Sequence, residues 1–279
     1  MKESKSRNRK RSERLSEKKV RHILGLSGGK DSTALALYLK NEIPDIEYFF
    51  CDTHKELPET YEYIDKLEIL LGKKINRLEP NRGFDHWLDI YDGFLPNPRT
   101  RWCTKKLKIE PLEKFVGDDE TVSYIAIRAD EDRVGYISTK PNIKPVFPFM
   151  RDGLIKRDIF RIIEESGIGM PRYYSWRSRS GCFFCFFQRK VEWVRLYETH
   201  RDLFEKAIKY EQEHSDGRRY YWNQEESLQE LIRRKDQIIA DHKKIMKQKK
   251  NNLPNKPLIE VFDSALDDET QDFCFVCNL

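Results

Sequence analysis

Apolar runs and amphipathic stretches alternate along the first two thirds of the chain, starting near Val20. Short apolar runs between turns predict buried strands, and stretches with apolar positions at helical spacing predict helices. The strands are expected at 22–26, 46–51, 75–78 and 121–127, with a further extended segment at 146–149. The helices between them are expected at 33–40, 59–71 and 157–166. This alternation predicts an α/β fold, a parallel twisted sheet with helices on both faces.

The chain divides by composition into three parts. Residues 1–19 are polar and basic without apolar periodicity, which predicts a flexible tail. Residues 20–190 hold the alternating strands and helices, and we expect them to form one nucleotide-binding domain. Residues 191–279 contain two charged, helix-forming stretches, 191–213 and 225–250, and end in a cysteine-containing segment. This last part is expected to be a helical accessory region.

The overall composition is that of a folded protein. With 279 residues and 38% hydrophobic content the chain can bury a core, which excludes a wholly disordered protein. No apolar run approaches the ~18 residues of a membrane-spanning helix, and no apolar stretch of a signal peptide follows the basic start. We therefore expect a cytoplasmic protein with no membrane partner. The formal net charge is +5, and much of the positive charge lies in the basic tail.

The most informative segment is the polar turn between the first predicted strand and helix, Ser27-Gly28-Gly29-Lys30-Asp31-Ser32. Glycines let the backbone approach a phosphate, and successive N–H groups at a helix N-terminus attract its charge. Lys30 can neutralise that charge. The glycine spacing differs from that of a Walker A loop. A plain tight turn would leave Lys30 unexplained, so the segment predicts an anion-binding loop.

This loop resembles the PP-loop of ATP pyrophosphatases, which holds the pyrophosphate leaving group of ATP. The resemblance implies adenylation and an adenine nucleotide alpha hydrolase-like fold. Further segments resemble motifs of the adenylylsulfate and phosphoadenylylsulfate reductase family. They are Cys51-Asp52-Thr53 with Leu57-Pro58-Glu59-Thr60-Tyr61, Arg101-Trp102-Cys103-Thr104-Lys105-Lys106-Leu107-Lys108 with Pro111-Leu112, and Ile127-Arg128-Ala129-Asp130-Glu131-Asp132-Arg133. The resemblance spans roughly residues 20–205.

The resemblance assigns roles to residues of these motifs. The expected ligands of the ATP pyrophosphate are Ser27, Gly28, Gly29, Lys30, Asp31 and Ser32. Lys30 and Asp31 are also expected to be catalytic, with Arg128 and Arg133 on the transferring group. Asp52 and Thr53 are expected near the adenosine or its metal. Mg²⁺ is expected because a polyphosphate leaving group needs more neutralisation than one lysine supplies.

Five of the six cysteines are candidate metal ligands, namely Cys103, Cys182, Cys185, Cys274 and Cys277. The two Cys-x-x-Cys pairs suit a metal or iron–sulfur centre better than disulfides in a reducing compartment. Cys103 and the pair Cys182/Cys185 can supply three thiolates, and Cys274 or Cys277 the fourth. Four thiolates hold a [4Fe–4S] cluster or a structural zinc. The family resemblance favours the cluster, and zinc is the alternative. A third possibility is that these cysteines are buried structural residues that bind no metal.

The chain departs from the reductases at their cysteine motifs. Phosphoadenylylsulfate reductases carry a nucleophilic cysteine in a Glu-Cys-Gly motif near their end, whereas this chain has Asp272-Phe273-Cys274. Iron–sulfur adenylylsulfate reductases carry two adjacent cysteines where this chain has Trp102-Cys103. Both differences disfavour an adenylylsulfate or phosphoadenylylsulfate reductase, which stays the alternative.

The favoured function is an ATP pyrophosphatase that adenylates a nucleic-acid oxygen so that sulfur can replace it. This resembles the Dnd/Ssp-type sulfurtransferases of DNA phosphorothioation, or the thiolating enzymes of transfer RNA, with DNA favoured. A flexible cationic tail gains affinity for a phosphate backbone through counterion release, which supports a nucleic-acid partner. A cysteine desulfurase is the expected sulfur donor. A non-catalytic nucleotide-binding module is disfavoured, because Lys30 and Asp31 are both present.

Overall fold

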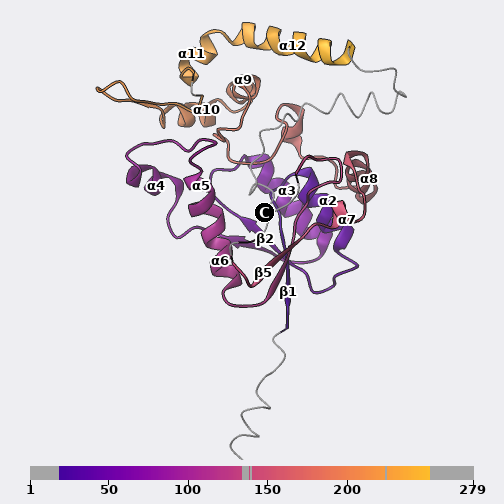
Figure 1. The fold of residues 1–279 in the computed structure, drawn as a ribbon. Helices are drawn as coiled ribbons and strands as arrows, with labels where there is room; N and C mark the ends of the chain where they lie inside the picture. Colours follow the sequence, from indigo (N-terminus) through magenta and orange to yellow (C-terminus); the bar gives the residue numbers. More distant parts are fainter. Residues whose placement is uncertain (1–18, 134–137, 139, 224, 252–279) are drawn as a thin grey trace, which may run out of the picture.

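The computed structural model describes residues 19–133, 138, 140–223 and 225–251. Its centre is a five-stranded sheet in the order β3-β2-β1-β4-β5, in which every neighbouring pair is parallel. The strands are β1 (Arg21–Gly25), β2 (Glu47–Cys51), β3 (Ile75–Leu78), β4 (Thr121–Tyr124) and β5 (Ile143–Val146). In Figure 1 the chain enters β1 from below, so the carboxyl ends of all five strands point upward.

Successive side chains of the central strands pack against helices on opposite faces of the sheet. Leu24 of β1 and Phe50 of β2 join one core with α2, α3 and α8, whereas Ile23 and Phe49 join another with α6. The two-residue period of a strand produces this division. The four helices are α2 (Lys30–Leu39), α3 (Pro58–Leu71), α6 (Glu110–Val116) and α8 (Lys156–Ser166). The predicted parallel α/β fold with helices on both faces is therefore confirmed.

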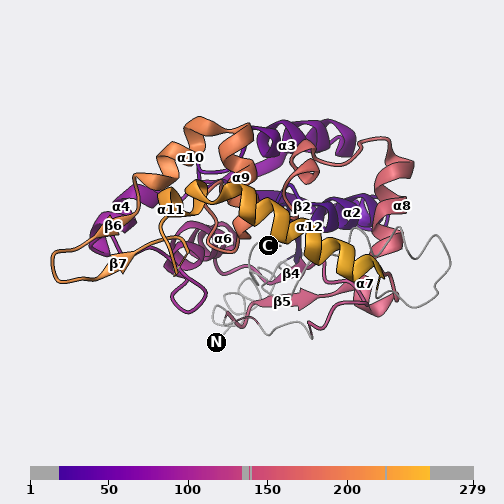
Figure 2. The same ribbon diagram turned by 90° about the horizontal axis from the view of Figure 1, so that it is seen from above.

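The C-terminal region is helical, as predicted, and lies beyond the carboxyl ends of the strands (Figure 1). Seen from above, α9 and α12 lie over the sheet (Figure 2). The elements are α9 (Lys190–Thr199), α10 (Arg201–Ile208), α11 (Leu228–Arg233) and α12 (Lys235–Asn251), with a hairpin of β6 (Gln212–Glu213) and β7 (Arg219–Tyr220).

Each of the two helix-forming stretches of this region contains two helices. The backbone of His200 leaves helical geometry, with φ −134° and ψ 67°, and separates α9 from α10. Arg234, with φ −111° and ψ 25°, separates α11 from α12. The helical pattern of the sequence did not show where these helices end.

A third core joins these helices to segments far away in the sequence. It contains residues of α4 (Phe84–Ile90) and of α5 (Trp102–Thr104), which continues through a π-helical turn (Lys105–Ile109) into α6. The Phe84 ring stacks on Trp102 at 5.0 Å, and Phe184 stacks on Trp222 at 4.8 Å. The domain boundary expected at residue 190 stays a prediction. Residues from before and after this boundary pack together in the third core.

Two smaller expectations need correction. The strand expected at 121–127 ends at Tyr124, because the following segment leaves the sheet and brings Arg128 to Asp31. The extended segment expected at 146–149 lies earlier, as β5, and α7 (Pro148–Arg151) begins there with a proline at its first turn, where proline is favoured. Within the described ranges no helix is both long and apolar enough to cross a bilayer.

Candidate active site

The loop Ser27–Ser32, called the PP-loop below, connects β1 to the N-terminus of α2 and needs both of its glycines. Gly28 has a φ of +72°, and a Cβ there would lie 2.7 Å from Cγ2 of Thr60. A Cβ on Gly29 would lie 2.9 Å from Oγ of Ser180. At Gly28 the left-handed φ and the close neighbour both favour glycine, whereas at Gly29, whose φ is −95°, only the close neighbour does. The loop is therefore held in one conformation by packing from α3 and from the segment around residue 180.

Hydroxyl groups from the segment 173–180 hold the PP-loop, and sequence reasoning missed them. Ser180 donates a hydrogen bond to Oγ of Ser27 at 3.1 Å, and Oγ of Ser27 lies 3.2 Å from Oγ of Ser32. Tyr173 donates to the carbonyl of Gly28 at 2.7 Å, and the backbone N–H of Lys30 donates to the Tyr174 hydroxyl at 3.2 Å. No local pattern marked these hydroxyls, because their partners lie far away in the chain.

The charged residues beside the loop form a connected chain of ion pairs. Nζ of Lys30 lies 3.2 Å from Asp31, and Nη1 of Arg128 lies 2.9 Å from the other oxygen of Asp31. Arg128 also pairs with Glu131 at 3.3 Å, and Arg133 donates to Glu131 at 2.6 Å. Burial alone would raise the pKa of Asp31, but the charges of Lys30 and Arg128 outweigh it and lower this pKa below its ordinary value.

The structure therefore brings Lys30, Asp31 and Arg128 together, while Arg133 joins them through Glu131. Asp31 lies in the first turn of α2, which follows β1, and Arg128 follows β4, so the pair connects the ends of two neighbouring strands. In the strand order β3-β2-β1-β4-β5 the chain runs from β1 towards one edge of the sheet and returns through β4 towards the other edge, so the junction of β1 and β4 is the topological switch point, where open α/β sheets bind ligands.

The two residues expected near the adenosine point to different neighbours. Asp52 accepts hydrogen bonds from the backbone N–H of His54 at 2.9 Å and from the Tyr61 hydroxyl at 2.8 Å. Burial and this contact with Asp52 raise the pKa of Tyr61. Thr53 instead donates to Glu56 at 2.9 Å and lies 3.3 Å from Sγ of Cys182. Thr53 thus connects the β2 loop to the cysteines.

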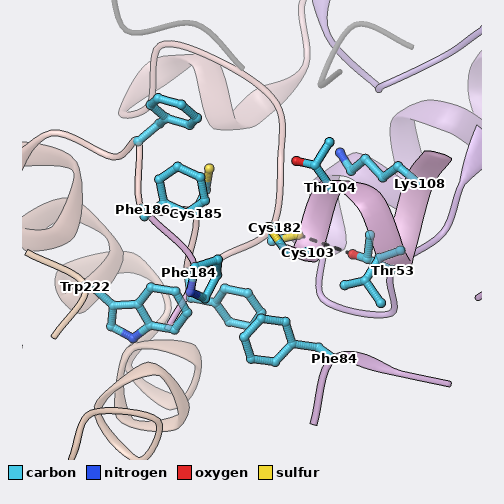
Figure 3. Close-up of a pocket in the computed structure, with 13 residues that line it drawn as sticks. Thr53, Phe84, Cys103, Thr104, Lys108, Cys182, Phe184, Cys185, Phe186 and Trp222 are labelled. Carbon is cyan, nitrogen blue, oxygen red and sulfur yellow. Dashed lines mark hydrogen bonds between the residues drawn. The ribbon is translucent and has the colours of Figure 1, made fainter. Parts of the chain in front are cut away.

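Three predicted metal ligands line one cavity with about 470 Å³ of empty volume, called the cysteine cavity below. Its wall includes Thr53, Cys103, Lys108, Cys182, Cys185 and Trp222. Figure 3 shows the Cys182 sulfur facing Thr53 and Cys185 beside Phe186. Burial and the Glu56 carboxylate raise the pKa of the Cys182 thiol, while Nη2 of Arg179 lies 3.5 Å from Sγ of Cys185.

The sulfur atoms of Cys103, Cys182 and Cys185 are suitable metal ligands, but they are not arranged closely enough to form a metal site by themselves. In the part of the chain that the structure describes, no group of three or more His, Cys, Asp or Glu side chains is gathered closely enough to hold a metal ion. The other two predicted ligands, Cys274 and Cys277, lie outside the described residues. The iron–sulfur centre, its zinc alternative and the Mg²⁺ ion therefore stay predictions.

A second, smaller cavity lies between the PP-loop and the cysteines. Ser27, Cys51, Glu56 and Lys108 line it, and its empty volume is about 250 Å³. Lys108 also lines the cysteine cavity, so one lysine borders both spaces. Cys51 is buried, as expected of a core residue, and burial raises its pKa to about 12. Sequence reasoning assigned no role to Glu56 or Lys108.

Several known proteins match parts of this chain. Residues 21–141 match the family model of the phosphoadenosine phosphosulfate reductase domain. This domain match includes the PP-loop, Asp52, Thr53, Cys103, Arg128 and Arg133, all of which were predicted site residues. It ends before the Cys182/Cys185 pair and before the C-terminal helices. Residues 21–141 are thus similar to this domain, and the other described segments lie outside the match.

Individual proteins are similar to parts of this chain. An uncharacterized protein of Methanocaldococcus jannaschii is 30% identical, over 66% of this chain and 40% of that protein. A tRNA-specific 2-thiouridylase, MnmA of Actinobacillus succinogenes, is 31% identical over 39% of this chain and 31% of that enzyme. The chain therefore spans less than half the length of these two relatives. A crystal structure of phosphoadenylyl-sulfate reductase from Candida auris gives a TM-score of 0.47 at 13% identity, over 62% of this chain and 85% of that one.

Proposed function

We propose that this protein uses ATP to adenylate an oxygen atom of a nucleic acid, so that a sulfur nucleophile can replace that oxygen. The observation that carries the proposal is the direct attachment of the cysteine segment to the PP-loop. Ser180 hydrogen-bonds Ser27, Thr53 contacts Cys182, and Lys108 borders both cavities. A phosphate-binding loop and thiol groups thus share one site, as transfer of sulfur to an activated oxygen requires.

In the first step the substrate oxygen attacks the α-phosphorus of ATP, the bond to the β-phosphate breaks, and pyrophosphate leaves. The N–H groups of the PP-loop and the Lys30 ammonium stabilise the negative charge on the leaving pyrophosphate. Asp31 is held ionised by Lys30 and Arg128, so it fixes both cations at the loop. Mg²⁺ would supply further neutralisation of the phosphates when bound.

In the second step a sulfur nucleophile, written here as hydrosulfide, attacks the activated atom, and AMP leaves with the original oxygen. The overall change consumes ATP and hydrosulfide and yields the thiolated product, AMP and pyrophosphate. We assign Cys103, Cys182 and Cys185 to this half of the site. Together with Cys274 or Cys277 they would hold a [4Fe–4S] cluster or, alternatively, zinc. A cysteine desulfurase is the proposed source of the sulfur; it delivers persulfide sulfur, which two thiol equivalents reduce to hydrosulfide while they form a disulfide.

Nucleic acid is the proposed acceptor, with DNA phosphorothioation first and transfer-RNA thiolation second. The basic segment 1–19 supports a polyanionic partner. Basic residues of the hairpin contribute less, because Arg218 pairs with Asp216 and Arg219 pairs with Glu213. We therefore assign nucleic-acid affinity mainly to the N-terminal segment.

The test is an anaerobic assay of the full chain with ATP, Mg²⁺ and sulfide, in the presence of DNA, RNA or phosphoadenylylsulfate. We expect AMP and pyrophosphate in equal amounts, stimulated by one nucleic acid, and a thiolated nucleoside after digestion. Lys30→Ala should lower pyrophosphate release at least ~100-fold. Lys206→Ala, which removes an exposed lysine paired with Asp202, is the matched control.

Three outcomes would contradict the proposal. ADP as the product would exclude cleavage between the α- and β-phosphates. Undiminished pyrophosphate release in Lys30→Ala would place the reaction elsewhere. Release of sulfite from phosphoadenylylsulfate, with no effect of DNA or RNA, would support the reductase alternative.

A further inference from the structure

Two basic segments that contain no acidic residue meet at the wall of the cysteine cavity. Asp and Glu make up 47 of the 279 residues, yet none occurs in 93–109 or in 166–191. The first segment carries Arg99, Arg101, Lys105, Lys106 and Lys108, and the second carries Arg172, Arg177, Arg179, Arg189 and Lys190. Any carboxylate that pairs with these cations comes from another part of the chain, as Glu225 does for Lys190.

Phe187 joins the two segments. The guanidinium carbon of Arg101 lies 5.6 Å from the centre of the Phe187 ring, and that of Arg179 lies 4.6 Å from it. Phe187 is half-buried and lines the cysteine cavity, and Nη2 of Arg179 lies 3.5 Å from Sγ of Cys185. We call Arg101, Phe187 and Arg179 the arginine clamp. One aromatic ring thus holds two cations at the wall that contains the cysteines.

Stacked guanidinium groups of this kind are suited to binding phosphate. Contact with an aromatic ring uses the face of the guanidinium group and fixes its plane. The N–H donors point outward in that plane, and their spacing matches two oxygens of a phosphate group. Two cations on the same ring also attract an anion more strongly than either does alone. The arginine clamp therefore favours an anionic ligand over a neutral one.

The chain places the arginine clamp between the two halves of the proposed reaction. Arg179 directly precedes Ser180, whose hydroxyl donates a hydrogen bond to Ser27 of the PP-loop at 3.1 Å. Arg101 is the N-cap residue of α5, the short helix that contains Cys103. A phosphate group on the clamp would therefore lie beside the cysteines, on the segment that also holds the PP-loop.

We infer that the arginine clamp binds a phosphodiester group of the nucleic-acid strand, at or next to the position that is modified. The inference rests on the proposed nucleic-acid substrate and names the surface of the folded part of the chain that receives it. The basic segment 1–19 supplies most of the affinity, whereas the clamp fixes the strand relative to the cysteines. The clamp contacts the backbone, so it positions the strand without reading its bases.

The test measures binding of labelled DNA and RNA to the full chain by fluorescence anisotropy at several salt concentrations. Arg101→Ala and Arg179→Ala should each bind about 10-fold more weakly, as expected for a lost hydrogen bond to a charged group. The slope of log affinity against log salt should fall by about 0.7 to 0.9 for each lost phosphate contact. A purely structural role of these arginines would not change this slope.

Arg101→Lys and Arg179→Lys separate charge from geometry. Lysine keeps the positive charge, so the salt slope should stay nearly unchanged, but it lacks the planar fork, so part of the affinity should be lost.

Arg201→Ala is the matched control. Arg201 also stacks on an aromatic ring, 4.0 Å from the centre of Tyr197, but it lies on α10 and pairs with Glu205 at 2.9 Å. This variant should keep the affinity and the slope of the unsubstituted protein. Thermal unfolding shows that each variant is folded, and iron and zinc are measured per chain because Arg179 contacts Cys185.

The inference is overturned if both alanine variants of the clamp keep the affinity and the salt slope, or if Arg201→Ala weakens binding equally. Weaker binding of phosphoadenylylsulfate with unchanged binding of nucleic acid would also overturn it and make the clamp a site for a small nucleotide. Loss of nucleic-acid affinity that occurs only together with loss of iron or zinc would overturn it in favour of a supporting role at the metal centre.

These failures differ from failure of the proposed function. If the clamp variants bind normally while the unsubstituted protein still thiolates a nucleic acid and releases pyrophosphate, only the arginine clamp is wrong. If no nucleic acid binds or stimulates pyrophosphate release, the proposed substrate and the clamp are both wrong.

Discussion

Arg128 donates a hydrogen bond from Nη1 to Oδ1 of Asp31 at 2.9 Å, which ties the loop after β4 to the first turn of α2. Both side chains are largely buried, and Asp31 also contacts Lys30. This contact brings charged groups that follow two neighbouring strands together at the PP-loop.

We predict that Arg128→Ala destabilises the fold and lowers pyrophosphate release at least ~100-fold. Removing one partner of a buried ion pair leaves Asp31 undercompensated, which costs about 3 to 5 kcal/mol of unfolding free energy. The lowered pKa of Asp31 contributes stability above its unfolded value of 3.8, and this is lost as the pH falls through the folded value. The difference in unfolding free energy between Arg128→Ala and the unsubstituted protein should therefore become smaller at acidic pH. Urea unfolding at several pH values measures it, with exposed Arg161→Ala as the control.

Gly28→Ala should destabilise the protein by about 1 to 3 kcal/mol and weaken ATP binding, because its Cβ would meet Thr60. Gly153 is the matched control. It has a similar φ of +69°, but a Cβ there would have no described heavy atom within 4 Å, so Gly153→Ala should cost only the backbone contribution of about 1 kcal/mol. Adding Thr60→Ser to Gly28→Ala should restore part of the loss. Equal losses in the two alanine variants would contradict the steric explanation.

Anaerobically purified protein should be brown, and Cys103→Ser, Cys182→Ser or Cys185→Ser should each remove the colour and the iron. Cys51→Ser is the control and should keep both, because Cys51 lines the other cavity. Iron, zinc and acid-labile sulfide are measured per chain. Stoichiometric zinc without iron would favour the structural-metal alternative, and a metal-free protein would argue against any centre here.

Glu211 should make the protein less stable as the pH rises from about 4.5 to about 7. Burial raises its pKa from 4.5 to about 7, although hydrogen bonds from the backbone of Leu228 and Trp222 oppose the rise. The folded protein thus binds this proton more tightly than the unfolded chain, so its contribution is present at low pH and lost through pH 7. Glu211→Gln should flatten this part of the stability profile in urea unfolding. An unchanged profile would exclude a raised pKa.

Deleting residues 2–19 should weaken binding to nucleic acid and reduce its salt dependence, while pyrophosphate release from ATP alone stays nearly unchanged. If the segment neutralises ~4 phosphates, the slope of log affinity against log salt should fall by about 3 to 4. Fluorescence anisotropy with labelled DNA and RNA at several salt concentrations measures both quantities. Equal affinity and slope before and after deletion would favour a small sulfonucleotide substrate.

Local features of the sequence were enough to predict the sheet, the flanking helices and the PP-loop. A buried strand, the glycines and Lys30 depend mainly on neighbouring residues, so their periodicity and order carry the information. The family motifs also predicted Arg128, Thr53 and Cys103 as site residues, and the Cys-x-x-Cys spacing predicted Cys182 and Cys185, but neither gave their contacts. Helix ends at His200 and Arg234 were missed, because tertiary packing decides where those helices turn.

Only the tertiary structure decided which of these residues meet. Ser180 reaches Ser27 across 153 positions, Arg128 reaches Asp31 across 97, and Cys182 reaches Glu56 across 126. Such contacts form where parallel strands end at one edge of the sheet and a C-terminal core presses its loops against that edge. Since they depend on packing between distant segments, no local pattern of hydrophobic and polar positions records them.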